Sequence, residues 1–497
     1  MGHDPAGMLR PLSLDWIGMN EASWLSRWVK RVMLVMAGGV GVLVLLWIAW
    51  AWYAQHMLDV EIAKVRARGE PLKWEDLRLG PLPDEQNAVV LLKRAGKEAS
   101  AANPNGEDVP ASSAYSCPEQ LPYPAKWHQM MRNAYPAHAK VYPLVRQAQV
   151  VGQGVWEQHV SYPTQDMAWM RELANILGDT ALYHHFQGND QEAVATLQDL
   201  YFLADAVDQQ PSFTSKLVGI GIRMLAMHRT MVMTTELRLE SKDNPAGAKR
   251  EAVLALMRRL GDEEATRRQL IEGLSDDRVW ELEMLNAPEN RAYVVRPAHL
   301  LDAAAGMRNI QRGIEGIEHP SLPYEMPWRP GKPSAPGWSG NKLVLQYLTP
   351  ITHGWDVAKA CTQLWVMHSA EHRCTLIALA VALYRCDHGG YPSSLAELVP
   401  MYLDAVPKDP TALDGGEIRY WLAAGGKRPM LCLAGDDAVV QTKDESTIPT
   451  HVMYGRQYTT GVACDDQFRD LSAWVDPNPP PVGSEPEPTT LPAGGQN

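Results

Sequence analysis

One uncharged apolar run, from Val32 to Tyr53, decides the compartment in which the rest of this 497-residue chain folds. As an α-helix, a run of this length rises about 33 Å, enough to cross the roughly 30 Å hydrocarbon core of a bilayer. Amphipathic tryptophan rings suit the headgroup layer, and they gather at both ends of the run, at Trp24, Trp28, Trp47, Trp50 and Trp52. The run therefore predicts a transmembrane helix over residues 32–53.

A cleavable signal peptide is the alternative to a permanent anchor. The triplet Ala49-Trp50-Ala51 has the A-x-A form of a cleavage site. However, the run is longer than the roughly 7 to 15 residues of a secretory apolar region, and a polar segment, residues 1–31, precedes it. These features favour an uncleaved anchor, so the lipid bilayer is an expected partner.

The charges beside the run predict its orientation. Arg27, Lys30 and Arg31 directly precede it, whereas Asp59 and Glu61 are the first charged residues after it. Basic residues favour the cytoplasmic side of a span. We therefore expect residues 1–31 to be a cytoplasmic segment, and the bulk of the chain to lie outside the cytoplasm, held in the cell inner membrane by a single pass.

Charge and cysteine usage narrow the expected partners. The net charge is −12 at pH 7, and an acidic chain repels phosphate backbones, so nucleic acid is not an expected partner. The expected partners are other membrane or extracytoplasmic proteins. The six cysteines are compatible with disulfides in an oxidising space or with small buried thiols, and the absence of a C-x-x-C pair disfavours a zinc ribbon.

Residues 54–318 are expected to form a mainly helical domain. Apolar residues recur at helical spacing from Asp166, Gly188 and Asn189 mark a turn, and residues 191–207 continue with a second helical pattern. The pair predicts a helical hairpin that loosely resembles one tetratricopeptide unit. No second copy follows, so we expect a lone hairpin inside a larger domain. Further helices are predicted over residues 217–237 and 248–260, with core methionines in the first.

Proline-rich segments mark the remaining boundaries. Prolines and glycines crowd residues 319–340, which cannot sustain a helix or a central strand and are expected to be a linker. A second such stretch, residues 476–497, is expected to be a disordered tail. Residues 341–475 between them are expected to form a separate module.

This module carries an ordered set of motifs. A helix predicted over residues 357–385 is followed by D-H-G-G-Y-P at 387–392, L-A-E-L at 395–398 and P-K-D-P at 407–410. Strands are then predicted over 417–421 and 430–433. The order resembles the globular domain of type II secretion major pseudopilins. The resemblance implies a long helix packed on a small antiparallel sheet, so the expected fold is mainly α with a small α+β C-terminal module.

Departures from the pseudopilin pattern limit what the resemblance implies. The N-terminus lacks the processed leader, so we do not expect a filament subunit. Such pseudopilins often bind calcium in an acidic loop, and the carboxylates available here are Asp436, Asp437, Asp444 and Glu445. Their spacing lacks the usual glycines, so a solvated loop is the alternative to a calcium site.

The layout of the whole chain supports a second resemblance. An R-A-R-G-E-P-L segment at residues 66–72 and an Asn-Ala pair at 87–88 follow the apolar run, and a helical middle precedes the pseudopilin-like end. This arrangement resembles uncharacterised membrane-anchored proteins of planctomycete-type bacteria. The resemblance implies an architecture and a compartment, and no activity.

One short string is a candidate zinc site. His368 and His372 are four residues apart in the predicted long helix, which places both imidazoles on one face, and Glu371 between them is a candidate catalytic base. The nearest downstream carboxylates for a third ligand are Asp387 and Glu397. The alternative is the polar face of a packed helix. The adjacent pair His184-His185 is a weaker candidate, because neighbouring residues diverge on a helix.

Three functional classes follow. The leading hypothesis is a non-enzymatic, single-span extracytoplasmic protein that acts as an interaction or scaffold protein, with no cofactor. The second is a membrane-anchored zinc hydrolase that uses His368, Glu371 and His372. The third is an accessory protein of a type II secretion-like apparatus. No nucleophile elbow and no phosphate-binding loop occur in the sequence, so serine hydrolases and P-loop enzymes are disfavoured.

Overall fold

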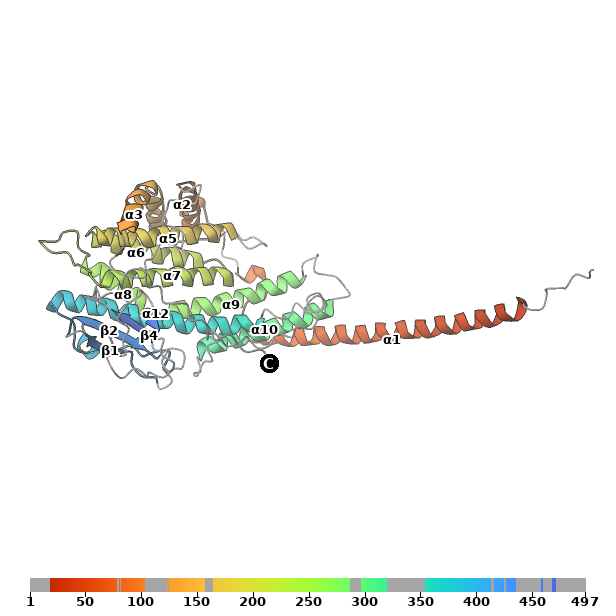
Figure 1. The fold of residues 1–497 in the computed structure, drawn as a ribbon. Helices are drawn as coiled ribbons and strands as arrows, with labels where there is room; N and C mark the ends of the chain where they lie inside the picture. The colour runs from red at the N-terminus through yellow and green to blue at the C-terminus, as the bar shows by residue number, and fades with distance from the viewer. Residues whose placement is uncertain are drawn as a thin grey trace, which may run out of the picture.

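The computed structural model describes residues 18–77, 80, 82–102, 123, 125–156, 164–286, 296–319, 354–412, 415–423, 426–434, 457–458 and 467–470. This part of the chain is mainly helical with a small antiparallel sheet, as expected (Figure 1). The α-helices are α1 (Gly18–Ala67), α2 (Ala88–Ala102), α3 (Ala125–Ala137), α4 (Val141–Val151), α5 (Thr164–Phe186), α6 (Asp190–Asp208), α7 (Phe213–Thr234), α8 (Arg250–Gly261), α9 (Glu263–Asn286), α10 (Arg296–Glu318) and α12 (Gly354–His388). The strands are β1 (Arg419–Ala423), β2 (Arg428–Leu433), β3 (Gln457–Tyr458) and β4 (Gln467–Asp470), and the 3₁₀ helices are η1 (Trp74–Leu77), η2 (Asp84–Gln86) and η4 (Leu395–Leu398).

Helix α1 contains the apolar run and continues beyond it. The run projects away from the other helices (Figure 1), and its helix is long and apolar enough to cross a membrane. From Ala54 onward one stripe of the same helix is buried, at Ala54, Leu58, Glu61 and Val65, where it packs against α9 and α10. The helix stops before Gly69. The φ of this residue is 73°, a left-handed conformation that glycine adopts at little steric cost.

Helices α5 and α6 form the predicted hairpin. Gly188 turns the chain with φ of 80°, and the Asn189 side chain caps α6 by accepting a hydrogen bond from the Glu192 N–H. Helix α7 packs on α6 and α5. A side chain at Gly219 of α7 would collide with Asp208 of α6, so these two helices approach closely because residue 219 has no Cβ.

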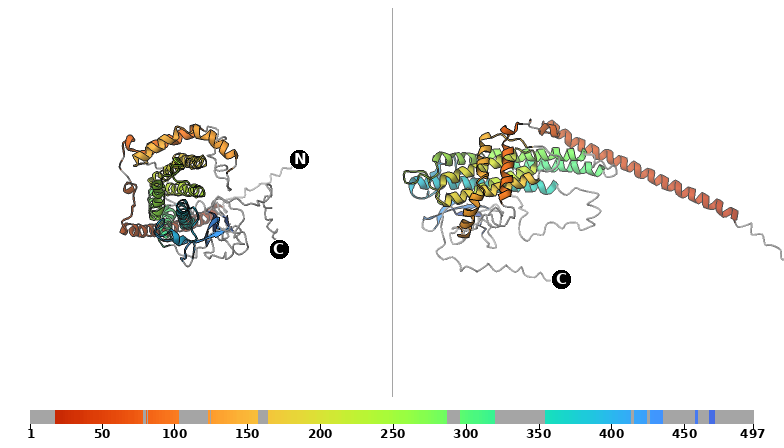
Figure 2. Two further views of the ribbon diagram at one scale, coloured as in Figure 1. Left: turned by 90° about the vertical axis from the view of Figure 1, so that its left-hand side faces the viewer. Right: turned by 90° about the horizontal axis from the view of Figure 1, so that it is seen from above.

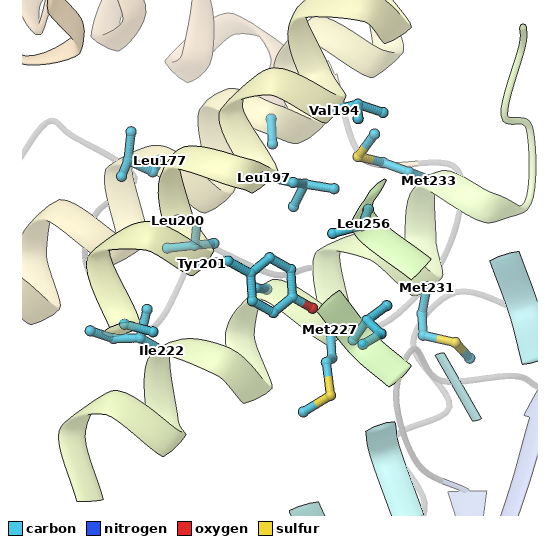
Figure 3. Close-up of a cluster of buried hydrophobic side chains, with 14 of the residues drawn as sticks. Leu177, Val194, Leu197, Leu200, Tyr201, Ile222, Met227, Met231, Met233 and Leu256 are labelled. Carbon is cyan, nitrogen blue, oxygen red and sulfur yellow. The ribbon is translucent and has the colours of Figure 1, made fainter. Parts of the chain in front are cut away.

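The main core lies between α5, α6, α7 and α8. Figure 3 shows Leu177, Leu197, Leu200 and Ile222 pointing into it, beside Met227, Met231 and Met233 of α7. All three methionines are buried. They fill this core as predicted, because flexible thioethers adapt to irregular gaps.

Helices α2, α3 and α4 lie at the edge of the stack opposite α1 and the sheet, and they run across the direction of α5 to α7 (Figures 1 and 2). Asn87 holds the start of α2, because its Oδ1 accepts hydrogen bonds from the N–H groups of Val89 (3.1 Å) and Val155 (3.0 Å). Gly96 of α2 lets Trp169 of α5 come close, since a Cβ there would lie 2.6 Å from the Trp169 Cβ.

Helix α12, which follows the expected linker at residues 319–340, contacts helices that precede it. It packs against α7, α8 and α10, and Cys374, Ile377 and Leu383 belong to the same hydrophobic core as α5 and α6. The β2 side chains Leu431 and Leu433 belong to that core as well. Buried side chains on both sides of the expected linker thus share one core, because α12 presents an apolar face to α7 as well as to the sheet.

The turn after α12 follows the predicted motif. Gly389 ends the helix with φ of 74°, and Asp387 accepts hydrogen bonds from Arg250 (2.7 and 2.8 Å) and from the Tyr402 hydroxyl (2.6 Å). Helix η4 matches the L-A-E-L string. Strands β1 and β2 pair antiparallel as predicted, and β4 and then β3 extend the sheet in the order β1-β2-β4-β3.

Several predictions fall outside the described residues. These are the linker over 320–340, the tail over 476–497 and the first 17 residues of the N-terminal segment. Among the cysteines in the described part, Cys374 and Cys432 are buried, and Cys386 is an exposed free thiol.

Candidate functional site

A cavity of about 420 Å³ opens between α3 and α4 on one side and α5 and α6 on the other. One wall is aromatic and apolar, with Tyr135, Pro136, Tyr142 and Pro143. The polar wall has Arg146 of α4, Thr180 and His184 of α5, and Glu192 and Asp199 of α6. Concave sites with an apolar lining and a few convergent polar groups are the usual form of ligand pockets.

Helical periodicity places the polar wall. On α4, Val141, Val145 and Ala148 are buried, which turns Arg146 on the neighbouring face toward α6. On α6, Glu192 and Asp199 are seven residues apart, two turns on one face. The pairing of α4 with α6 thus brings one guanidinium to two carboxylates.

Arg146 joins these two carboxylates. Its Nη2 pairs with Glu192, and its Nε lies 3.2 Å from Asp199 Oδ2. The Asp199 side chain is only 5% exposed, and burial raises its pKa to about 6 although Arg146 favours the ionised form. Asp199 therefore changes charge near neutral pH, unlike an ordinary aspartate.

The aromatic wall is built from stacked rings. Tyr135 stacks on Tyr142 with ring centroids 5.2 Å apart and meets the His184 ring edge-on at 5.0 Å. The Tyr142 hydroxyl lies 3.1 Å from the Thr180 Oγ1. Burial lowers the pKa of His184, so this imidazole is neutral at pH 7 and offers one donor and one acceptor.

The neighbouring His185 has a structural role. Its Nδ1 lies 2.6 Å from Asp190 Oδ1, and Arg238 donates to Asp190 Oδ2 from its backbone N–H and its Nε, both at 2.9 Å. His185 and Asp190 are almost completely buried. His184 and His185 therefore do not form one site. The His184 ring lines the pocket, whereas the His185 ring contacts Asp190 at the start of α6.

The candidate zinc residues lie inside the bundle. His368 and His372 are both buried, with ring centroids 5.6 Å apart. Burial lowers the pKa of each, that of His372 to about 4, and the charge of Arg223 adds to the effect. Neither ring nitrogen of His368 has a hydrogen-bond partner among the described residues.

The structure does not bring the proposed third ligands to these histidines. Asp387 lies about 22 Å further along the same helix and is held by Arg250 and Tyr402, and Glu397 accepts from the Tyr384 hydroxyl at 2.7 Å. Within the part of the chain that the structure describes, no group of three His, Cys, Asp or Glu side chains could hold a metal. Zinc here, with Glu371 as base, stays a prediction. The calcium candidates Asp436, Asp437 and Asp444 lie outside the described residues.

Comparison with known proteins found no matching family model, no similar curated protein and no similar solved structure. The site therefore has to be interpreted from its own geometry.

Most of the pocket was missed from the sequence. Pro136 and Pro143 interrupt the segment that forms α3 and α4 and hide its helical character. The buried residues Val141, Val145 and Ala148 do recur at helical spacing, and this signal could have revealed α4. No local sequence pattern predicts that Arg146 of α4 contacts Glu192 and Asp199 of α6.

Proposed function

We propose that this chain is a single-span, membrane-anchored, extracytoplasmic binding protein without enzymatic activity, whose helical domain recruits other proteins at the membrane. The observation that carries the binding role is the pocket between α3–α4 and α5–α6, which combines a stacked aromatic wall with three charged side chains. The pseudopilin-like and planctomycete-type resemblances agree with such a role and add no activity to it.

The geometry of α1 supports the anchoring part of the proposal. The exposed apolar run ends at Tyr53, and burial against α9 and α10 begins at Ala54 within the same helix. No flexible segment separates a bilayer around the run from the helical domain. The pocket is thus carried by a body that rests next to the membrane surface.

Site-specific photo-crosslinking in the protein's own cells tests the binding role. A benzophenone amino acid at Ala139, an exposed residue that lines the pocket, is expected to give discrete adducts with a partner protein. Val150 of α4 is a matched control, because it is 88% exposed and does not line the pocket. Equal labelling at both positions, or none at either, would contradict the proposal.

The orientation has its own test. In intact spheroplasts, added protease is expected to digest the domain after Tyr53 and to spare an epitope tag at the N-terminus until detergent opens the membrane. The reverse pattern would place the domain in the cytoplasm. No specific observation favours the hydrolase or the secretion-accessory hypothesis, and both stay predictions.

A further inference from the structure

We propose that the pocket receives the side chain of a lysine from a partner protein, with its ammonium group competing with Arg146 for the carboxylates of Glu192 and Asp199 and its alkyl stem along Tyr135 and Tyr142. This inference rests on the proposed function, because it names the chemistry of what the pocket binds.

The charged side chains that line the cavity carry an excess of negative charge. Among the described residues that line the cavity, Glu192 and Asp199 face one cation, Arg146, and the imidazole of His184 is neutral at pH 7. An ionised carboxylate has about four acceptor positions, so contacts with Arg146 leave acceptor positions on both. An ammonium group, a compact charge with three donors, complements this pair of carboxylates.

The aromatic and apolar wall suits an alkyl stem that ends in a cation. The rings of Tyr135 and Tyr142, with Pro136 and Pro143, present apolar surface for methylene groups. A ring face also attracts a nearby ammonium group, by about 0.5 to 2 kcal/mol in proteins generally. An anionic ligand would meet the two carboxylates instead, and an uncharged one would leave their free acceptor positions without a donor.

The size of the cavity agrees with this occupant. Its volume of about 420 Å³ falls within the range of roughly 300 to 1,000 Å³ for small-ligand sites. Arg146 and Glu192 are 42% and 34% exposed, so this part of the charged wall can be reached from solvent, whereas the Asp199 side chain is 5% exposed and lies deeper. A lysine side chain can therefore enter while its backbone stays in the partner.

The test is calorimetric titration of the full chain in detergent micelles at pH 7.5, where Asp199 is ionised. The probes are Nα-acetyl-lysine methylamide, its norleucine counterpart, which has no ammonium group, and Nα-acetyl-glutamate. We expect the lysine probe to bind at least tenfold more tightly than either of the others. Equal affinity for lysine and norleucine probes, or preference for the glutamate probe, would overturn the inference.

Charge variants separate the binding groups. Glu192→Gln and Asp199→Asn are expected to weaken binding of the lysine probe at least tenfold, whereas Glu251→Gln, at an exposed position on α8, leaves it unchanged. Arg146→Met removes the competing guanidinium and is expected to tighten binding several-fold. Loss of binding in Arg146→Met, with thermal unfolding unchanged, would contradict the proposal.

The two proposals fail in different ways. Adducts at Ala139 together with no preference for lysine would leave the binding role standing and overturn only the chemistry inferred for its ligand. Preference for lysine without adducts would support the pocket chemistry and contradict the recruitment of a partner protein.

Discussion

Single buried polar residues hold the helical domain together at several places. Asp190 is completely buried and accepts hydrogen bonds from His185 and from Arg238. His372 is also buried, where solvent cannot stabilise its charged form. The fold is therefore most stable while Asp190 is ionised and His372 is neutral.

Replacing Asp190 by alanine is expected to destabilise the protein by about 1 to 3 kcal/mol, because the buried His185 and the Arg238 backbone N–H lose their acceptor, whereas the partly exposed Arg238 guanidinium can be solvated. Thermal unfolding followed by near-ultraviolet circular dichroism measures the change. Asp243→Ala is the matched control, since Asp243 is exposed in the connection before α8. Similar melting temperatures for both variants would show that the Asp190 cluster contributes little.

Acid is expected to destabilise the protein through His372. Burial lowers the pKa of this residue in the folded state to about 4 from an ordinary value near 6.5, although Glu263 and Asp262 oppose the shift. The unfolded state therefore takes up the proton first, so stability is fully present above pH 6.5 and falls as the pH drops toward 4. One pKa unit is about 1.4 kcal/mol, so the loss is on the order of 3 kcal/mol.

Comparison of the wild type with His372→Gln isolates this effect from that of other titrating groups. Burial raises the pKa of Asp208 and Asp276 to about 6, which acts in the opposite direction but equally in both proteins. The melting temperature of the wild type is expected to fall more steeply between pH 6.5 and 4. His319→Gln, at an exposed position, should retain the wild-type slope.

At the scale of elements, two glycines of α7 differ in how closely a neighbouring helix approaches them. Gly219 faces Asp208 of α6, and a Cβ there would overlap the carboxylate that Arg223 also engages. Gly221 is exposed, with nothing within 4 Å of the position of its Cβ. Substitution by alanine should therefore change the free energy of unfolding in opposite directions at Gly219 and Gly221.

Gly219→Ala is expected to lower the free energy of unfolding by about 1 to 3 kcal/mol, the usual cost of overpacking. Gly221→Ala is expected to raise it by about 0.5 to 1 kcal/mol, because alanine favours the helix. Denaturant unfolding of both variants in the same detergent gives the comparison. A stabilising effect at Gly219 would mean that α6 and α7 are further apart than described.

Elements with local signals were predicted well from the sequence. Gly188 and Asn189 located the α5–α6 turn, and the motif at residues 387–392 located the end of α12. Helices α3 and α4 were missed because Pro136 and Pro143 weaken the local pattern. The zinc hypothesis used a correct helical spacing, but α12 turns His368 and His372 into the protein core, where burial rather than spacing decides their chemistry.

At the scale of the whole molecule, α1 connects the apolar run, which is long enough to cross a membrane, to the helical domain without a break. Leu58 is 3% exposed in a small core with residues of α9 and α10, whereas Val60 of the same helix is 36% exposed. This packing fixes the direction of the apolar run relative to α10.

Leu58→Asp is expected to loosen this connection without releasing the protein from the membrane. Hydrogen exchange should become at least tenfold faster over residues 54–67 and in α10, because a carboxylate cannot be buried there without a partner. Val60→Asp, two residues away on the exposed side, should leave the exchange rates unchanged. Equal protection in both variants would show that α1 and the domain are independently stable.

The sequence alone determined the features that depend on neighbouring residues. They are the apolar run of α1, the α5–α6 hairpin and the order of turns after α12, since each follows from local hydropathy, helical periodicity or turn chemistry. Tertiary structure alone decided that α12 shares the core of α5 to α7, and that Arg146 meets Glu192 and Asp199 beside Tyr135. These contacts join segments far apart in the chain, and their geometry depends on how whole helices pack.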